Sequence, residues 1–146
     1  MNPIVDVAMR FFALLFFCLN ISNVLAQESV KDQRMRQAEG YYVFYVTPRD
    51  VCAAAGPESL ARIDALLTTI RKEQLQAIEL VETSKEFFAV VTAARFMENE
   101  RARTEGARRN PAGECARQIE LMPRMYEHHK KNKLFEYLID LFSKPA

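Results

Sequence analysis

The stretch LARIDALLTTIRKEQLQAIELV, residues 60–81, decides the fold class of this chain. Its apolar side chains recur at spacings of three and four, which is the period of an amphipathic α-helix. Charged side chains occupy positions between them, so the stretch predicts a helix with one buried face. The predicted stripe consists of Leu60, Ile63, Leu67, Ile70 and Ile78, widened by Leu66, Leu75 and Val81.

Capping residues mark the boundaries on both sides of this stretch. The dipeptide Thr-Pro at 47–48 predicts the start of a short helix that ends at Gly56, and Pro57 then begins the long helix. Thr83 and Glu86 have the spacing of a capping box. Either a new helix begins there, or the long helix bends.

The C-terminal third contains two more helices. Asn-Pro at 110–111 predicts the start of a helix that runs to Pro123, and an amphipathic helix follows at 134–142. Residues 98–110 carry no bulky apolar side chain, and we expect them to be the most exposed internal segment. The other side chains that we expect to be buried are Phe87, Val91, Leu134, Leu138 and Ile139.

The run YYVFYV at 41–46 is the segment whose secondary structure the pattern leaves open. Aromatic and β-branched residues favour a strand, but the chain offers no second convincing strand to pair with it. A helix would place Tyr42 and Tyr45 on one stripe and would avoid a lone strand with unpaired backbone groups. We favour the helix, although Gly40 weakens it. The sequence therefore predicts an all-α fold, a single small bundle of four to five helices.

Residues 1–26 have the three parts of a secretory signal peptide. Arg10 precedes the apolar run FFALLFFCL, and the small residues Val24 and Ala26 fit the rule for signal peptidase. We expect cleavage after Ala26. The helical domain of residues 27–146 would then be periplasmic or secreted.

Two other interpretations of this N-terminus were weighed. A permanent membrane anchor needs ~20 apolar residues, whereas Asn20 and Ser22 interrupt the segment after a shorter run. A lipoprotein modified at Cys18 needs small residues before the cysteine, and Phe16 and Phe17 are bulky. Cleavage therefore remains the preferred prediction.

The charge balance gives no general reason to bind nucleic acid or an anionic membrane. The chain has 20 basic and 19 acidic residues, and removing Arg10 and Asp6 with the signal leaves 19 and 18. Beyond the signal no apolar run is long enough to span a bilayer. We therefore expect no nucleic-acid partner and no stable membrane span after cleavage.

Two cysteines, Cys52 and Cys115, remain after cleavage. An even pair in an oxidising compartment usually forms a disulfide. A bond between them would require residues 48–55 to pack against residues 111–122. The alternative is a reactive thiol or a metal ligand, but the chain has no Cys-x-x-Cys motif and no histidine near either cysteine.

No motif indicates catalysis, a metal or a cofactor. His128 and His129 are adjacent, which does not suit a metal pair on a helix, and the chain lacks Gly-x-Ser-x-Gly and phosphate-loop motifs. Aromatic side chains and an arginine-rich stretch are the candidates for a binding surface, although such aromatic clusters are more often core and such alternating charges usually mark a salt-bridged solvent face. The candidate binding residues are Tyr41, Tyr42, Tyr45, Arg101, Arg103, Arg108 and Arg109.

These observations predict an exported small helical protein that acts as a binding or interaction module for an unknown protein partner. Inhibitor-like, immunity-like and envelope-accessory roles all fit a compact surface-acting domain. The alternative function is an enzyme, a hydrolase whose site is assembled only in the fold. A cleft with converging acids or histidines would favour the enzyme, and an apolar patch would favour binding.

Overall fold

The computed structural model describes residues 28–96 and 109–145, and these residues contain helices and no strand. The all-α prediction is therefore confirmed. The predicted signal peptide and its predicted cleavage site lie outside the described residues, as do residues 98–108 of the segment expected to be most exposed. Within the described part, no helix combines the length and the apolar character that crossing a membrane would require.

The first element is one continuous helical rod, which runs through the segment that the sequence left open. It consists of α2 (Val30–Tyr41), a π-helical turn η1 (Tyr42–Val46) and α3 (Thr47–Ala55). Ser29 caps its start by accepting a hydrogen bond from the backbone N–H of Asp32. Gly56, with φ of 115°, ends it in a conformation that favours glycine.

The long apolar stripe forms two helices rather than one. These are α4 (Pro57–Glu73) and α5 (Leu75–Glu82), and the chain turns between them at Gln74. The sequence prediction missed this break. Two side chains at this break hold the hydroxyl of Tyr126, which donates to Glu73 over 2.5 Å and accepts from the Gln74 amide over 3.1 Å.

A new helix, α6 (Lys85–Phe96), begins after α5, as one of the two alternatives predicted. The capping residue is Ser84 rather than Thr83, because the Ser84 hydroxyl accepts from the backbone N–H of Phe87. The hydroxyl of Thr83 instead donates to the carbonyl of Glu79.

Two helices complete the described chain, α8 (Pro111–Lys131) and α9 (Leu134–Ser143). Asn110 caps α8 through the backbone N–H of Gly113, as predicted. The expected end at Pro123 is wrong, since α8 continues through the proline for two further turns. Proline removes one backbone hydrogen bond, and buried Met122 and Tyr126 on either side keep the helix packed.

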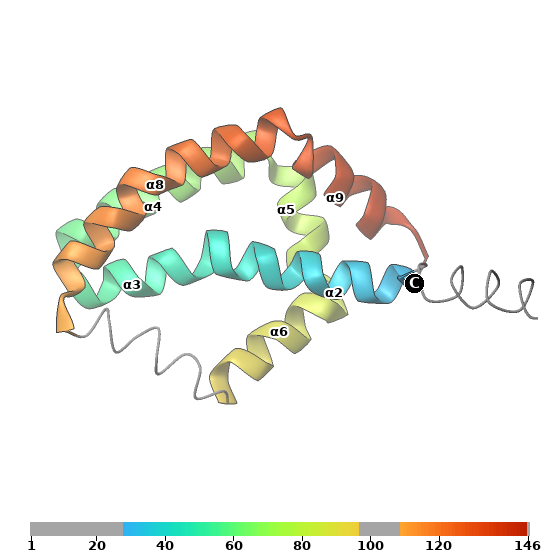
Figure 1. Cartoon of the computed structure of the whole chain (residues 1–146), viewed down its shortest axis with the longest axis horizontal. Helices are drawn as coiled ribbons and strands as arrows, with labels where there is room; N and C mark the ends of the chain where they lie inside the picture. Colours follow the sequence, from blue (N-terminus) through green and yellow to red (C-terminus); the bar gives the residue numbers. More distant parts are fainter. Residues whose placement is uncertain (1–27, 97–108, 146) are drawn as a thin grey trace, which may run out of the picture.

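The helices enclose the rod on three sides (Figure 1). α4 and α8 lie against each other and arch over the rod, and both contact α3. α5 descends from the arch towards the rod, and α9 packs against α5 and α2. α6 lies on the opposite side of the rod, against α2. α6 packs mainly against α2, with smaller contacts to α5 and η1.

The core agrees with much of the predicted stripe. Ile63, Ile70 and Leu138 are buried, and Leu60, Leu67, Phe87, Leu134 and Ile139 pack partly buried against the core. Val91 is wrong as a core residue, because α6 covers only one side of the rod and Val91 is half-buried outside the cluster. Phe88 on the same helix is 73% exposed.

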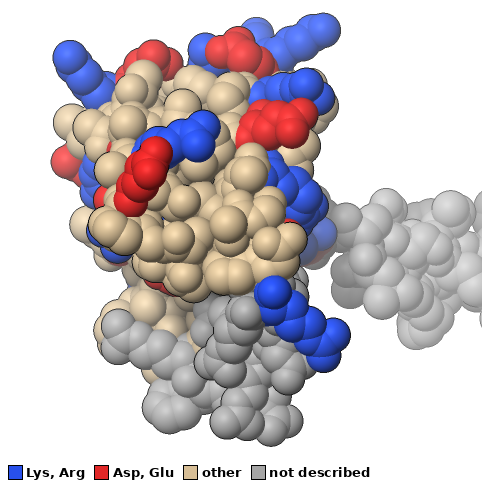
Figure 2. All heavy atoms as spheres, turned by 90° about the vertical axis from the view of Figure 1, so that its left-hand side faces the viewer, with Lys and Arg blue, Asp and Glu red and all other residues tan. Residues whose placement is uncertain are grey.

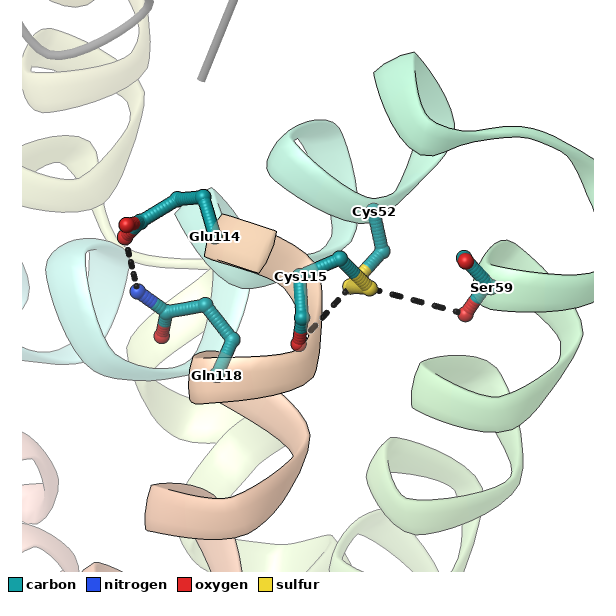
Figure 3. The surroundings of a disulfide bond; sticks show 5 residues. All are labelled: Cys52, Ser59, Glu114, Cys115 and Gln118. Atoms are coloured by element: carbon teal, nitrogen blue, oxygen red, sulfur yellow. Dashed lines mark hydrogen bonds between the residues drawn. A yellow bond between two sulfur atoms is a disulfide. The ribbon is translucent and has the colours of Figure 1, made fainter. Parts of the chain in front are cut away.

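The predicted disulfide joins Cys52 on α3 to Cys115 on α8, with Cα atoms 4.8 Å apart (Figure 3). The two side chains are fully buried. The carbonyl oxygens of Cys115 and Ser59 lie 3.9 and 4.0 Å from the sulfur atoms. Bonded sulfurs carry no hydrogen, so these are van der Waals contacts. The expected packing of α3 against the start of α8 is confirmed.

The surface at this end of the molecule carries charges of both signs. Figure 2 shows lysine, arginine, aspartate and glutamate side chains interspersed around a broad uncharged area. Many of the charges are paired, for example Arg49 on α3 with Asp64 on α4, and Arg117 with Glu114 on α8. Neighbouring charges of opposite sign largely cancel at a distance.

Candidate functional site

A pocket of about 310 Å³ opens between the rod and the turn that joins α8 to α9. Four aromatic side chains form much of its wall: Tyr41, Phe44, Tyr45 and Tyr137. Leucine side chains, two amides and two imidazoles complete the lining, and these residues are Leu134, Leu138, Gln37, Asn132, His128 and His129. None of the lining residues is aspartate, glutamate, lysine or arginine, although 27% of the chain is charged.

Gly40 lies inside α2 and lines this pocket. A Cβ atom added to it would meet nothing within 4 Å. Glycine inside a helix costs about 0.8–1.0 kcal/mol relative to alanine. No close packing and no unusual backbone angle requires a glycine here. The effect of the missing side chain is to keep the pocket open.

The π-helical turn η1 begins two residues after Gly40 and supplies two of the aromatic walls. Tyr45 faces the core and is 6% exposed, whereas Phe44 is 40% exposed. The hydroxyl of Thr47 and its backbone N–H both donate to the Tyr42 carbonyl, which closes the turn. π-Turns inside helices are rare and are frequent at functional sites.

A partly buried hydrogen bond fixes the floor of the pocket. The Tyr45 hydroxyl and Nδ1 of His129 are 2.6 Å apart. Burial lowers the pKa of His129, and the neighbouring His128 lowers it further. Burial raises the pKa of Tyr45. Both groups are therefore neutral near pH 7, and one hydrogen bond joins the Tyr45 hydroxyl to Nδ1 of the imidazole.

The rim of the pocket at the end of α8 is held by Asn132. Its side-chain nitrogen donates to the carbonyl of His128 over 2.9 Å and to Nε2 of His128 over 3.0 Å. Lys133 follows with a φ of 56° and turns the chain into α9. This turn brings Leu134, Tyr137 and Leu138 onto the pocket.

Tyr41 and Tyr45 separate this pocket from a second, charged cleft. Tyr41 and Tyr45 line both cavities, and the second, of about 400 Å³, also contains Arg71 and Glu82. The Tyr41 hydroxyl donates to Glu82 over 2.7 Å, and Arg71 donates to both oxygens of the same carboxylate. Burial would raise the pKa of Glu82, but the hydrogen bonds from Arg71 and Tyr41 outweigh it and lower the pKa.

The candidate residues chosen from the sequence fall in different places. Tyr41 and Tyr45 line the pocket as buried walls, whereas Tyr42 is half-buried and packs against Phe87 of α6. Arg109 is exposed just before α8. The structure does not bring it to the pocket, since the 21 residues of α8 span about 30 Å between the two. Arg101, Arg103 and Arg108 lie outside the described residues.

Sequence reasoning missed much of the pocket, namely Gly40, Gln37, Asn132 and Tyr137. Gly40 was the available signal, because an isolated glycine in a helical segment often has a packing or functional reason. The tertiary meeting of residues 37–45 with residues 128–138 has no local signature.

Metal binding and acid–base chemistry find little support in the described residues. No group of three or more histidine, cysteine, aspartate or glutamate side chains there could hold a metal ion. The rings of His128 and His129 diverge, with centroids 6.1 Å apart. Within residues 28–94 and 109–145, the hydrogen-bond partner of the His129 ring is Tyr45.

A buried ion pair lies apart from the pocket, where α2, α6 and the end of α9 meet. Arg34 and Glu86 approach to 3.5 Å, and Glu86 is 1% exposed. Neither oxygen of Glu86 has a hydrogen-bond partner among the described residues. Arg34 also stacks on Phe142 and donates to the carbonyl of Lys144 over 3.3 Å. This pair ties three helices together.

No protein-family model, curated protein or solved structure matches this chain. Its function must therefore be argued from the pocket itself.

Proposed function

We propose that this protein is an exported binding module, and that it binds a partner protein by receiving an uncharged apolar side chain of that partner in the pocket between α2, η1, α8 and α9. The observation that carries the proposal is Gly40. Its helix-interior position lowers stability, and its missing side chain keeps an aromatic pocket open.

A second unusual backbone feature borders the same pocket. The π-turn η1 replaces regular α-helix at Tyr42–Val46 and positions Phe44 and Tyr45. Local departures from the most stable backbone tend to accumulate at functional sites. Two such departures close together on one helix support a binding role for the cavity that they border.

The lining supports an uncharged apolar group as the occupant. A charged group would lose its hydration in this pocket without meeting an opposite charge, which is costly. An apolar side chain would instead exchange water for contact with four aromatic rings. Small, well-shaped pockets that take one anchoring side chain are typical centres of protein interfaces.

Export is the part of the proposal that places the module in a periplasmic or extracellular setting. Residues 1–26 have the pattern of a cleavable signal peptide. The buried bond between Cys52 and Cys115 is typical of proteins that fold in an oxidising compartment.

The hydrolase considered from the sequence is less well supported. Such a site needs a nucleophile and a base in contact, with a third group that orients the base. In the described residues Tyr45 is the partner of His129, and the hydroxyls of Ser29 and Ser84 are engaged as helix caps.

A comparative capture experiment tests the proposal. The purified protein, a Gly40→Leu variant and a Glu39→Leu variant would be immobilised and exposed to the exported proteins of the producing cells. Leucine at position 40 fills the pocket, while Glu39 is exposed on the same helix and does not line it. A partner retained by the wild type and by Glu39→Leu but lost with Gly40→Leu is expected. Partners bound equally by all three variants, or by none, would contradict the proposal.

A further inference from the structure

Building on the proposed function, we infer that the side chain received by the pocket is aromatic with a polar edge, that is, a tryptophan or tyrosine of the partner protein. The pocket combines aromatic walls with unpaired hydrogen-bonding groups at its rim. An aliphatic side chain would contact the aromatic walls but would leave the hydrogen-bonding groups at the rim unpaired. A charged side chain would gain from neither feature.

The walls already pack aromatic rings edge to face. His129 meets Phe44 at a centroid distance of 5.3 Å and Tyr45 at 5.7 Å, both in T-shaped arrangements. Such contacts are favoured for aromatic rings and add to the benefit of burying apolar area. A further ring in the pocket would extend this arrangement, since Phe44 and Tyr137 expose 40% and 41% of their surfaces beside it.

The rim offers hydrogen-bond acceptors and a donor that the described residues leave free. The side-chain amide of Gln37 makes no hydrogen bond with any of them. Asn132 uses its nitrogen on His128, and its side-chain oxygen remains available. The side-chain oxygens of Gln37 and Asn132 can accept from an indole N–H or a phenol O–H. The side-chain nitrogen of Gln37 can donate to a phenol oxygen.

The exposed rim favours a side chain carried by a protein over a free small molecule. Pockets for free ligands usually bury most of the ligand surface. Here Phe44 and Tyr137 face both the pocket and solvent. A partner whose anchor fills the pocket would therefore cover exposed aromatic surface around it, which is the usual anatomy of an anchored interface.

The chain contains no tryptophan, so the fluorescence of an added indole reports its own environment. The purified protein would be titrated into N-acetyl-L-tryptophanamide. We expect a saturable shift of emission to shorter wavelength, with a dissociation constant on the order of 1 mM for a single side chain. N-acetyl-L-tyrosinamide should displace the probe. N-acetyl-L-leucinamide should bind more weakly than the probe by a factor of about ten at least.

Variants place this binding in the pocket. Gly40→Leu should abolish the emission shift, whereas Glu39→Leu should leave it unchanged, and circular dichroism would verify that both remain folded. Absence of a shift with the wild type, or a shift that survives Gly40→Leu, would overturn the inference.

Two further outcomes separate this inference from the proposed function. If leucinamide displaces the probe as well as tyrosinamide does, the aromatic preference is wrong, although partner capture that depends on Gly40 would still stand. If free indole binds more tightly than the tryptophan amide, the pocket serves a small molecule and the protein anchor is overturned.

Discussion

Replacing both cysteines of the disulfide by alanine should destabilise the protein without changing its fold. The bond closes a loop of 63 positions between α3 and α8. The chain-entropy relation for a loop of this length gives about 4 kcal/mol at 25 °C. Alanine is preferred to serine because both positions are fully buried, and a buried hydroxyl would add a cost of its own. For a domain of this size the loss corresponds to a fall of about 15 °C in Tm.

Urea unfolding followed by circular dichroism measures this loss directly. The Cys52→Ala, Cys115→Ala variant should unfold at lower urea with a helical native spectrum, and reduction of the wild type should produce a similar shift. A loss below about 1 kcal/mol would refute the reasoning, because the bond would then restrain little in the unfolded chain. Two free thiols in the unfolded, unreduced wild type would refute the bond itself.

Three further predictions concern the pocket and the buried ion pair. Gly40→Ala should raise the free energy of unfolding by about 0.5–1 kcal/mol in urea melts, because it adds helix propensity where nothing clashes; a loss would show that Gly40 is required for packing. Arg34→Met should cost about 3 kcal/mol by leaving Glu86 charged and buried without a partner, and an added Glu86→Leu should recover most of it; equal losses in the single and double variants would contradict this. Because the pKa of His129 is below its ordinary 6.5, its contribution to stability is complete above pH 6.5 and is lost as the pH falls through the lower folded value. Melts of a His129→Gln variant, which lacks this titration, should therefore be less sensitive to pH in that range, and an unchanged profile would show that His129 does not titrate as described.

Local patterns were enough to predict the fold class and the disulfide. The stripe from Leu60 to Val81 and the cap at residue 110 depend on neighbours a few positions away, which is the range over which helix rules operate. The expected helix cap at Thr47 is wrong, because the rod continues through it and the Thr47 hydroxyl donates to the Tyr42 carbonyl instead of capping. The pair Cys52 and Cys115 followed from the number of cysteines and an expected export.

Tertiary contacts decided what local patterns could not. The break at Gln74 contains no proline or glycine, and its side chains hold Tyr126, some 50 positions away. Phe88 has the right spacing for a buried face, yet α6 has one main neighbour, and the residue is largely exposed. Pro123 lacks a backbone donor, but packing on both sides carries the helix through it.

Sequence reasoning could predict only part of the pocket lining. Tyr41 and Tyr45 could be chosen as candidates because aromatic residues are frequent in binding sites. Their partners on α8 and α9 lie about 85–95 residues later in the chain, and only the folded arrangement brings them together. From the sequence, Gly40 was expected to weaken the helix. In the structure, its missing side chain leaves open space that lines the pocket.

The most direct test of the central claim is a chemical-shift map of isotope-labelled protein titrated with the partner that the Gly40-dependent capture recovers. The account predicts the largest changes at the backbone amides of Gly40 and Phe44 and at the side-chain amides of Gln37 and Asn132. Changes concentrated around Phe88 on α6 or near Arg109, with the pocket amides unmoved, would contradict it.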